Sequence, residues 1–315
     1  MPTLSQLRYL VEVARRGHFG QAAQACHVSQ PTLSSQIAKA EQELGVVIFD
    51  RQAKPIAVTE NGRALIEQAT EVLLAHDTLV ALAQRKHESL SGAFHLGIIP
   101  TISPYLLPRF LAAFAHHYPL VQLSVLELTT DEIVQRIKEQ KLDAAVLATP
   151  LLESAIAEQV LFYDPFYLYA HPNESLLAEA VLDVHKLNPK KLWLLSDGHC
   201  FRNQVVNYCD IRQTHTHFGS VRFVAGTIET LRNLIDSAGG YTLVPEIFVQ
   251  TLSSSTRKAQ VRAFGKPLPT REIALVHHKR TAKLAIIEAL FAEIEQTLPV
   301  GVQRAADDSL VLSIS

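Results

Sequence analysis

Apolar residues recur at helical spacing from the start of the chain. Leu7, Leu10, Val11 and Ala14 fall on one face of a helix that begins near Leu4. The glycine of Arg16-Gly17-His18 follows the last of these positions, where a helix-stopping residue is expected. The pattern therefore predicts a first amphipathic helix that ends at this glycine.

Two further helical segments follow it, separated by a tight turn. A short alanine-rich helix is predicted over residues 20–26, and a longer one begins at Gln30. The side-chain oxygen of Ser29 can cap the longer helix, and Pro31 is tolerated because a first-turn amide has no helical partner. Gly45 is the expected end of this helix. Two short helices thus meet at a turn.

Residues 46–92 predict a β-ribbon followed by a long helix. Residues 46–58 contain an apolar run and short extended pieces around Pro55. From Glu60, apolar positions alternate at spacings of four and three for about seven turns, which is typical of a coiled-coil seam. We expect a dimerising linker helix here. The Ser89 to Gly92 segment closes it and marks a domain boundary.

Beyond residue 92, strands alternate with helices, a pattern that predicts parallel sheets. The expected strands are 94–99, 122–127, 144–147, 160–162, 166–170, 191–195, 221–224, 241–244 and 273–277, and the expected helices are 105–117, 131–139 and 282–298. The tail over residues 299–315 is weakly patterned and has no assigned element.

Composition narrows the class of protein without identifying its partner. Of 315 residues, 48% are hydrophobic and 19% charged, which excludes a disordered or fibrous chain. The formal net charge of −2 neither demands nor excludes a nucleic-acid partner. The sequence contains no run of about 18 to 20 apolar residues, and its start lacks a signal-peptide pattern. We therefore expect a cytoplasmic protein without a membrane span.

The helix pair near the start has the geometry of a DNA-binding element. A short helix, a tight turn and a polar-faced second helix can place side chains in a major groove about 12 Å wide. Residues 1–64 carry seven basic and five acidic side chains, a net charge of +2 that gives a modest phosphate footprint. An ordinary helical subdomain is the alternative interpretation.

Several short segments of this region resemble the winged helix-turn-helix of LysR-type transcriptional regulators. The similar segments, in the family's order and spacing, are His18-Phe19, Ala22-Ala23, Val28 to Ser34, Glu41 to Gly45, Phe49-Asp50-Arg51 and Thr59 to Gly62. The resemblance implies an α/β fold class with an N-terminal winged helix-turn-helix, a long linker helix and a two-lobed, periplasmic-binding-protein-like α/β effector domain.

The family plan divides the chain into four parts. It implies a winged helix-turn-helix DNA-binding domain over 1–59, a linker and dimerisation helix over 60–90, a two-lobed redox-sensing effector domain over 91–298 and a tail over 299–315. The DNA-binding residues that it implies are Ser29, Gln30, Pro31, Thr32, Ser34, Ser35, Lys39 and Arg51.

Two of the three cysteines are placed to change the conformation if they are oxidised. Cys200 falls in the first turn of a helix that Ser196 or Asp197 could cap, and a helix N-terminus with Arg202 nearby lowers a thiol pKa. In a continuous helix Cys209 would lie about 13 to 14 Å away. A disulfide requires Cα atoms within about 7 Å. The pair can therefore bridge only if the helix unwinds.

The chemistry open to such a pair is known, but two alternatives remain. Peroxide would oxidise Cys200 to a sulfenic acid that condenses with Cys209, and a cellular dithiol would reduce the disulfide. The residues alone favour a different interpretation, in which both cysteines are buried apolar side chains. Zinc is a third, since His199, His215 and His217 lie near the pair, although the spacing matches no standard zinc pattern.

Within the LysR family, the effector region resembles the peroxide-sensing members. The similar segments are Ile98 to Thr101, Pro104 to Pro108, Asp197 to Cys200, Cys209, and Glu229 to Asn233, with a departure at Asn203, where an acidic residue is expected. The resemblance implies that Cys200 is the peroxidatic thiol and Cys209 the resolving one. It also implies a peroxide pocket lined by Thr101, Thr130, His199 and Arg271, whose threonine hydroxyls can donate and accept hydrogen bonds.

Enzymatic and cofactor motifs are missing from the sequence. It contains no Walker loop, Rossmann glycine pattern, nucleophile elbow or zinc-protease helix. We therefore expect neither an enzyme of these classes nor a metal or other cofactor. Cys26, in the helix before the turn, is interpreted as a buried packing thiol.

Taken with the resemblance, the cysteine pair predicts a hydrogen-peroxide-sensing DNA-binding transcription regulator, switched by a reversible Cys200–Cys209 disulfide. The implied partners are double-stranded DNA, RNA polymerase, hydrogen peroxide, a cellular dithiol reductant and further copies of the chain in a homodimer that assembles to a homotetramer. Two alternatives are a regulator of the same architecture that senses a metabolite between the effector lobes, and a thiol-dependent peroxidase, which would leave the N-terminal region unexplained.

Overall fold

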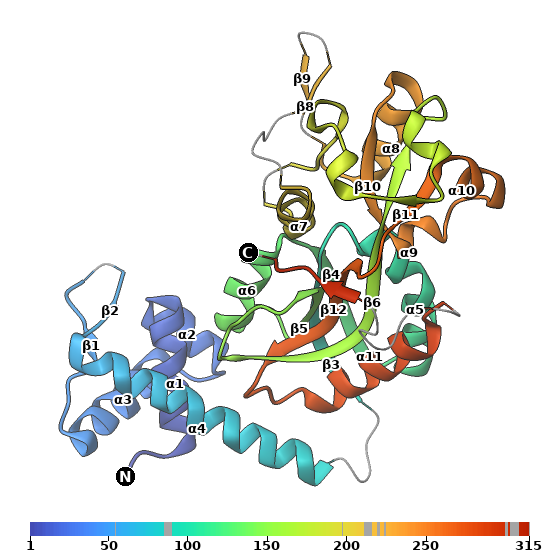
Figure 1. The fold of residues 1–315 in the computed structure, drawn as a ribbon. Helices are drawn as coiled ribbons and strands as arrows, with labels where there is room; N and C mark the ends of the chain where they lie inside the picture. The colour runs from blue at the N-terminus through green and yellow to red at the C-terminus, as the bar shows by residue number, and fades with distance from the viewer. Residues whose placement is uncertain are drawn as a thin grey trace. The chain divides into compact units, whose positions relative to one another are not determined.

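The chain folds into two compact units. The computed structural model describes residues 1–53, 55–84, 90–196, 198–210, 216–218, 221–223, 225–299, 302 and 309–314. The first unit holds residues 1–88 with 280–283, and the second holds 89–279 with 284–315 (Figure 1). None of the described helices is long and apolar enough to cross a membrane.

Four helices and a two-stranded ribbon make up the first unit. They are α1 (Leu4–Arg16), α2 (Phe19–Ala25), α3 (Gln30–Leu44), β1 (Phe49–Asp50), β2 (Ala57–Val58) and α4 (Glu60–Gln84). The predicted α3 is confirmed at both ends. Ser29 Oγ accepts the Thr32 N–H at 3.3 Å, and Gly45 ends the helix at φ 69°, a conformation that glycine adopts without strain. Leu33 and Ile37 are fully buried in this unit's own core.

The second unit is built on one nine-stranded mixed sheet. Its strands are β3 (Gly92–Ile98), β4 (Val121–Glu127), β5 (Ala144–Thr149), β6 (Ile156–Ala170), β7 (Val181–Leu182), β10 (Tyr241–Pro245), β11 (Val261–Phe264), β12 (Leu268–His278) and β13 (Ser309–Val311). The order is β4-β3-β5-β12-β6-β11-β7, with β10 beside β6 and β13 beside β12. A separate antiparallel pair consists of β8 (Thr216–Phe218) and β9 (Val221–Phe223).

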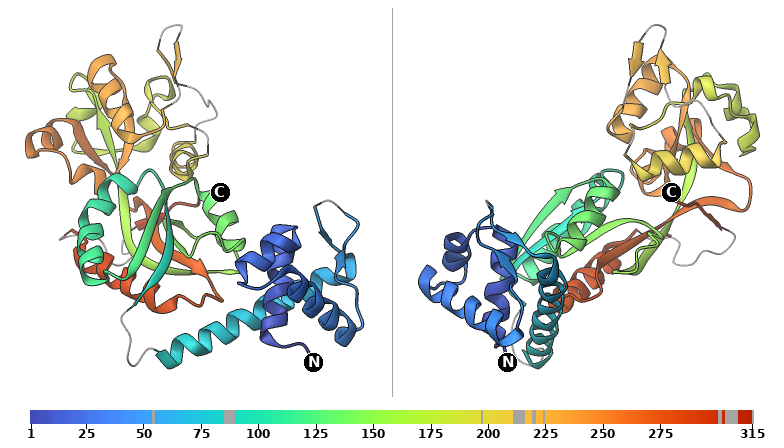
Figure 2. Two further views of the ribbon diagram at one scale, coloured as in Figure 1. Left: turned by 180° about the vertical axis from the view of Figure 1, so that it is seen from behind. Right: turned by 90° about the vertical axis from the view of Figure 1, so that its left-hand side faces the viewer.

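Helices complete the second unit. They are α5 (Ser103–His117), α6 (Thr130–Lys138), α7 (Cys200–Tyr208), α8 (Ile228–Ala238), α9 (Glu246–Val249), α10 (Ser254–Gln260) and α11 (Leu284–Thr297), with 3-10 turns η1 (Ser175–Ala178), η2 (Val184–Lys186) and η3 (Pro189–Lys191). The unit has two lobes, one around β3, β4 and β5 and the other around β10 and β11. Figure 2 shows the long strand β6 running from the first lobe to the second. Residues 156–165 of β6 pair with β12, and residues 166–170 pair with β10.

Three predictions about the sheet are corrected by the structure. The strands expected at 160–162 and 166–170 are one strand, because Asp164 and Pro165 continue the extended backbone between them. The strand expected at 191–195 is instead the end of η3 followed by isolated bridges at Leu192 and Leu195. The predicted parallel pairing is only partly observed: β3 pairs parallel with β4 and β5, β11 with β7 and β12 with β13, whereas β12 and β6 return antiparallel and link the two lobes.

Candidate functional site

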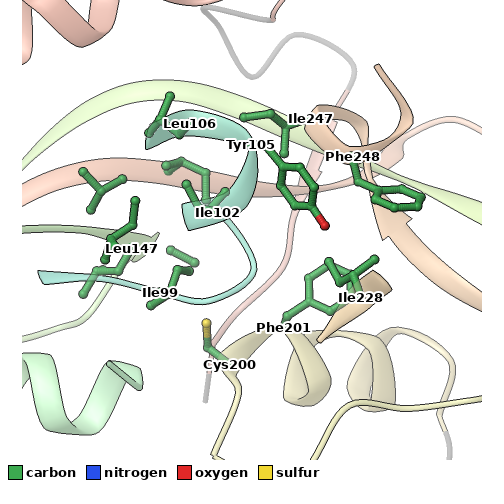
Figure 3. Close-up of a cluster of buried hydrophobic side chains, with 14 of the residues drawn as sticks. Ile99, Ile102, Tyr105, Leu106, Leu147, Cys200, Phe201, Ile228, Ile247 and Phe248 are labelled. Carbon is green, nitrogen blue, oxygen red and sulfur yellow. The ribbon is translucent and has the colours of Figure 1, made fainter. Parts of the chain in front are cut away.

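Cys200 is the first residue of α7 and is buried between the two lobes of the second unit. The N-cap residue is His199, whose side chain makes no capping hydrogen bond. The predicted cap by Ser196 is therefore wrong, and Asp197 lies outside the described residues. Only 7% of Cys200 is exposed. Figure 3 shows its sulfur directed toward the side of the cluster that holds Ile99.

Burial raises the pKa of the Cys200 thiol, contrary to the expectation of a lowered value. Three smaller effects oppose burial, namely the Thr130 hydroxyl, the positive charge of Arg271 and the backbone amides at the start of α7. Arg202, expected to supply the positive charge, is not among these groups. The thiol is therefore held protonated in this conformation, by a degree of burial that local sequence does not reveal.

A buried ion pair lies beside this thiol. Arg271 on β12 donates to Asp164 Oδ2 from Nε at 3.0 Å and from Nη2 at 2.8 Å, and both side chains are about fully buried. Its Nη1 donates to Thr101 Oγ1 at 2.8 Å. The Ile247 N–H donates to Asp164 Oδ1 at 3.0 Å. Burial raises the pKa of Asp164, and the guanidinium with the backbone amides opposes this by stabilising the carboxylate.

Thr130 supplies a buried hydroxyl beside the Cys200 thiol. Its Oγ1 is buried, and within the described part of the chain no atom meets hydrogen-bond geometry with it. A buried polar group without a partner is costly, and such sites recur where a ligand binds. Thr130 is the first residue of α6 and its hydroxyl acts on the Cys200 thiol. This hydroxyl is therefore free to bond a small polar molecule at the sulfur.

His199 is half-buried at the start of α7. Removal from water lowers its pKa, so the imidazole is neutral at physiological pH. A neutral imidazole can both donate and accept a hydrogen bond. Of the predicted pocket residues, Thr130 and Arg271 both act on the Cys200 thiol, Thr101 accepts a hydrogen bond from Arg271, and His199 precedes Cys200 in the chain.

Apolar side chains from both lobes close the space around the thiol. Phe201 packs under Arg271, whose guanidinium carbon lies 5.2 Å from the ring centroid. Tyr105 of α5 hydrogen-bonds Glu229 of α8 across the lobes, and its ring meets that of Phe248 edge-on at 5.8 Å. Figure 3 shows Phe201 next to Cys200, with Tyr105 and Phe248 farther along the same cluster. The thiol therefore lies among buried, mainly apolar side chains.

Cys209 lies at the opposite end of α7 from Cys200. It is the residue that follows the helix, and burial raises its pKa to about 12. Nine residue steps of α-helix span about 13 to 14 Å, so the reduced thiols cannot meet while α7 is intact. Both cysteines are free in this structure. The predicted separation is confirmed.

The zinc alternative gains no support. Among the described residues, no group of three or more His, Cys, Asp and Glu side chains is arranged to hold a metal ion. His215 lies outside the described residues, and the side chain of His217 is not described either. Cys26 is half-buried at the end of α2 rather than fully buried, and burial raises its pKa.

The predicted DNA-binding residues cluster on α3 and the ribbon. Pro31, Ser35 and Lys39 recur every four residues and are exposed on one stripe of α3. Gln30 and Thr32 are exposed in its first turn, Ser29 is the N-cap and Ser34 is half-buried. Arg51 Nη2 contacts Glu41 Oε2 at 3.1 Å, and its Nη1 lies 3.5 Å from Ser34 Oγ. These residues form one exposed polar surface.

Sequence reasoning missed Asp164, although a signal was present. Asp164 interrupts the run Leu161 to Leu168, which is otherwise apolar or aromatic apart from Pro165. A carboxylate inside a buried strand needs a partner of opposite charge. That partner, Arg271, is 107 positions away, and nothing local in the sequence links the two.

Known proteins similar to this chain share its two parts. The family described as "LysR substrate binding domain" matches residues 87–299, and "Bacterial regulatory helix-turn-helix protein, lysR family" matches residues 4–63. The chain is 33% identical over 308 residues to a "Hydrogen peroxide-inducible genes activator" from Dickeya chrysanthemi, covering 97% of this chain and 99% of the relative. It is 34% identical to the "DNA-binding transcriptional dual regulator OxyR" of Escherichia coli, covering 87% of this chain and 88% of that protein.

Two solved structures are similar over nearly the whole chain. A full-length OxyR variant from Pseudomonas aeruginosa superposes with a TM-score of 0.72 at 32% identity, covering 95% of this chain and 99% of that one. A hydrogen-peroxide-bound OxyR variant from Corynebacterium glutamicum gives a TM-score of 0.58 at 28% identity, covering 94% of each chain.

Proposed function

The chain belongs to the LysR family of transcriptional regulators, in the group that contains OxyR, and on this basis we propose that it is a DNA-binding regulator that senses hydrogen peroxide. Its fold class is the predicted one, a winged helix-turn-helix and linker helix followed by a two-lobed α/β effector domain. The members of this family are regulators rather than enzymes.

One observation carries the proposal. The buried Cys200 thiol lies beside the buried Thr130 hydroxyl, which makes no geometrically defined hydrogen bond among the described residues, and near the guanidinium of the buried Arg271–Asp164 pair. The two oxygens of hydrogen peroxide can accept hydrogen bonds from Arg271 or His199, and its O–H groups can donate to the threonine oxygens.

The proposed reaction has two balanced steps. The Cys200 sulfur attacks one peroxide oxygen, the O–O bond breaks, and the thiol proton leaves with the other oxygen as water, giving a sulfenic acid. The Cys209 sulfur then attacks the sulfenic sulfur and displaces its hydroxide. The hydroxide takes up the Cys209 proton and leaves as a second water. The product is a Cys200–Cys209 disulfide, which a cellular dithiol would reduce by exchange.

Formation of this disulfide requires α7 to unwind, and we propose that the unwinding changes the effector domain's contacts. The change would reach the DNA-binding units through dimers formed by α4, in a tetramer, and would alter contact with RNA polymerase. Thr101, Thr130, His199 and Arg271 would bind the peroxide. The DNA target implies that the protein acts in the cytoplasm.

Intact mass and free-thiol counting test the redox proposal. The reduced full-length protein, treated briefly with near-stoichiometric peroxide, should lose two protons and two thiols, because a single disulfide removes both. The variant Cys209→Ser should trap one added oxygen on Cys200, and Cys200→Ser should keep its mass and its remaining thiols. Retention of all thiols in the parent protein would exclude peroxide sensing through this pair.

Lys39→Ala tests the proposed DNA surface. Lys39 is exposed on the stripe of α3 that carries Pro31 and Ser35, where a lysine would neutralise a DNA phosphate. The variant should bind a duplex of mixed sequence less tightly, and the slope of log affinity against log salt should decrease by about 1. Fluorescence anisotropy with a labelled duplex measures both quantities.

Lys190→Ala is the matched control, because Lys190 is equally exposed but belongs to the second unit. Its affinity and salt slope should equal those of the parent protein. A Lys39→Ala variant with an unchanged slope would show that this lysine does not contact DNA.

A further inference from the structure

The C-terminal strand β13 joins the strand that carries Arg271 to the helix that begins with Cys200. It runs parallel to β12, with Thr270 opposite Val311, and the Leu312 N–H donates to Thr270 O at 2.8 Å. Both ribbon figures draw this red C-terminal segment beside α7 (Figures 1 and 2). Residues 309–311, in the tail for which the sequence predicts no element, are thus part of the sheet.

A single side chain of α7 makes the connection. Gln204 is fully buried, and its Nε2 donates to Leu312 O at 2.9 Å. Its Oε1 is buried and has no hydrogen-bond partner within the described residues. Leu312 is buried and belongs to the unit's hydrophobic core, with Ile314 packed against that core. The tail therefore supplies the carbonyl oxygen that accepts the hydrogen bond of the Gln204 side-chain amide.

Resting on the function proposed above, we propose that Gln204 and the C-terminal residues 309–314, which begin with β13, form a latch that positions α7 as a helix and sets how readily the Cys200–Cys209 disulfide forms. Gln204 is a positioning residue in this proposal, because it acts on Cys200 through the helix and touches no reacting atom. The latch segment is residues 309–314.

The physical reason is that oxidation and the latch compete for the same helix. The disulfide requires α7 to unwind, and unwinding carries Gln204 away from Leu312 O. A buried carbonyl that loses its donor carries an unfavourable free energy. The reduced state has the hydrogen bond between Gln204 and Leu312, and the oxidised state loses it. The hydrogen bond therefore favours the dithiol over the disulfide. A variant without the latch should therefore oxidise more readily.

Two full-length variants test the latch, namely Gln204→Leu and a deletion of residues 309–315. In the reduced protein, hydrogen exchange of the α7 backbone amides should be about tenfold faster in each variant. In glutathione redox buffers, the equilibrium constant for oxidation should rise about tenfold, which is about 30 mV toward a more negative potential. The combined variant should equal the deletion alone, because both changes remove the same contact.

Gln260→Leu is the matched control. Gln260 is also a buried glutamine whose Nε2 donates to a backbone carbonyl, that of Ala170 at 3.2 Å, and it lies on α10. Its variant should leave α7 exchange and the oxidation equilibrium unchanged. Unchanged exchange and equilibrium in both latch variants would overturn the proposal, as would equal shifts in Gln260→Leu, which would indicate general destabilisation.

The failure of the redox function is distinguishable from the failure of the latch. A parent protein that forms no Cys200–Cys209 disulfide would overturn the proposed function. The exchange measurement requires no oxidation, so it would still decide whether the tail holds α7 in place.

Discussion

Asp164→Leu should lower the free energy of unfolding of the second unit by about 3 to 5 kcal/mol and prevent Cys200 from reacting with peroxide. Asp164 accepts two hydrogen bonds from Arg271 in a site that excludes water. Without the carboxylate, Arg271 is a buried cation with no counter-ion. Its guanidinium would also no longer be oriented toward Thr101 and the pocket.

Denaturant unfolding of the reduced protein, followed by tryptophan fluorescence, measures the stability. The chain has a single tryptophan, Trp193, which is buried in the second unit, so the signal reports on that unit. The rate of thiol loss with peroxide gives the reactivity of Cys200.

The double variant Asp164→Leu with Arg271→Met separates stability from reactivity. It replaces the whole ion pair by apolar side chains, so most of the lost stability should return. Its Cys200 should still react slowly, because the pocket has lost the guanidinium. If the variant Asp164→Leu alone unfolded at the same denaturant concentration as the parent protein, the ion pair would not contribute to stability as proposed.

Thr130→Val should slow the reaction of Cys200 with peroxide by about a hundredfold without lowering stability. Valine has nearly the shape of threonine and removes a buried hydroxyl that has no hydrogen-bond partner among the described residues, so folding loses no bond. Losing one preorganised hydrogen-bonding group at a reaction centre costs about 10²-fold to 10³-fold in rate. The thiol would also lose a group that lowers its pKa. Stopped-flow measurement of thiol loss gives the rate.

Thr242→Val is the matched control and should show the opposite pattern. The buried Thr242 Oγ1 donates to Trp193 O at 2.7 Å, away from the thiol, so its loss should lower stability and leave the rate unchanged. Equal rates in Thr130→Val and the parent protein would remove Thr130 from the proposed peroxide pocket.

The first unit could be predicted almost entirely from the sequence, because its determinants are local. The Ser29 side chain accepts the backbone N–H of Thr32, three residues later, and Gly45 adopts the left-handed conformation that ends α3. The buried Leu33 and Ile37 recur at helical spacing. Each signal lies within a few residues of the element that it defines. The polar stripe on α3 follows from the same spacing.

The redox site was only half predictable, because its chemistry depends on contacts between distant segments. The positions of Cys200 and Cys209 at opposite ends of one helix follow from their spacing. The direction of the Cys200 pKa does not, because burial by both lobes outweighs the helix N-terminus. The same is true of β13, whose place depends on the edge of a strand about forty residues earlier.

By itself, the sequence determined the elements that form by local capping and periodicity, together with the thiols available for oxidation. Only the tertiary structure decided which groups surround Cys200. Asp164 and Arg271 meet because β6 and β12 pair antiparallel across 107 residues. Gln204 meets Leu312 across 108 residues, through the pairing of β13 with β12. Burial and charge pairing are properties of the assembled fold, and for this reason the environment of the thiol could not be deduced from neighbouring residues.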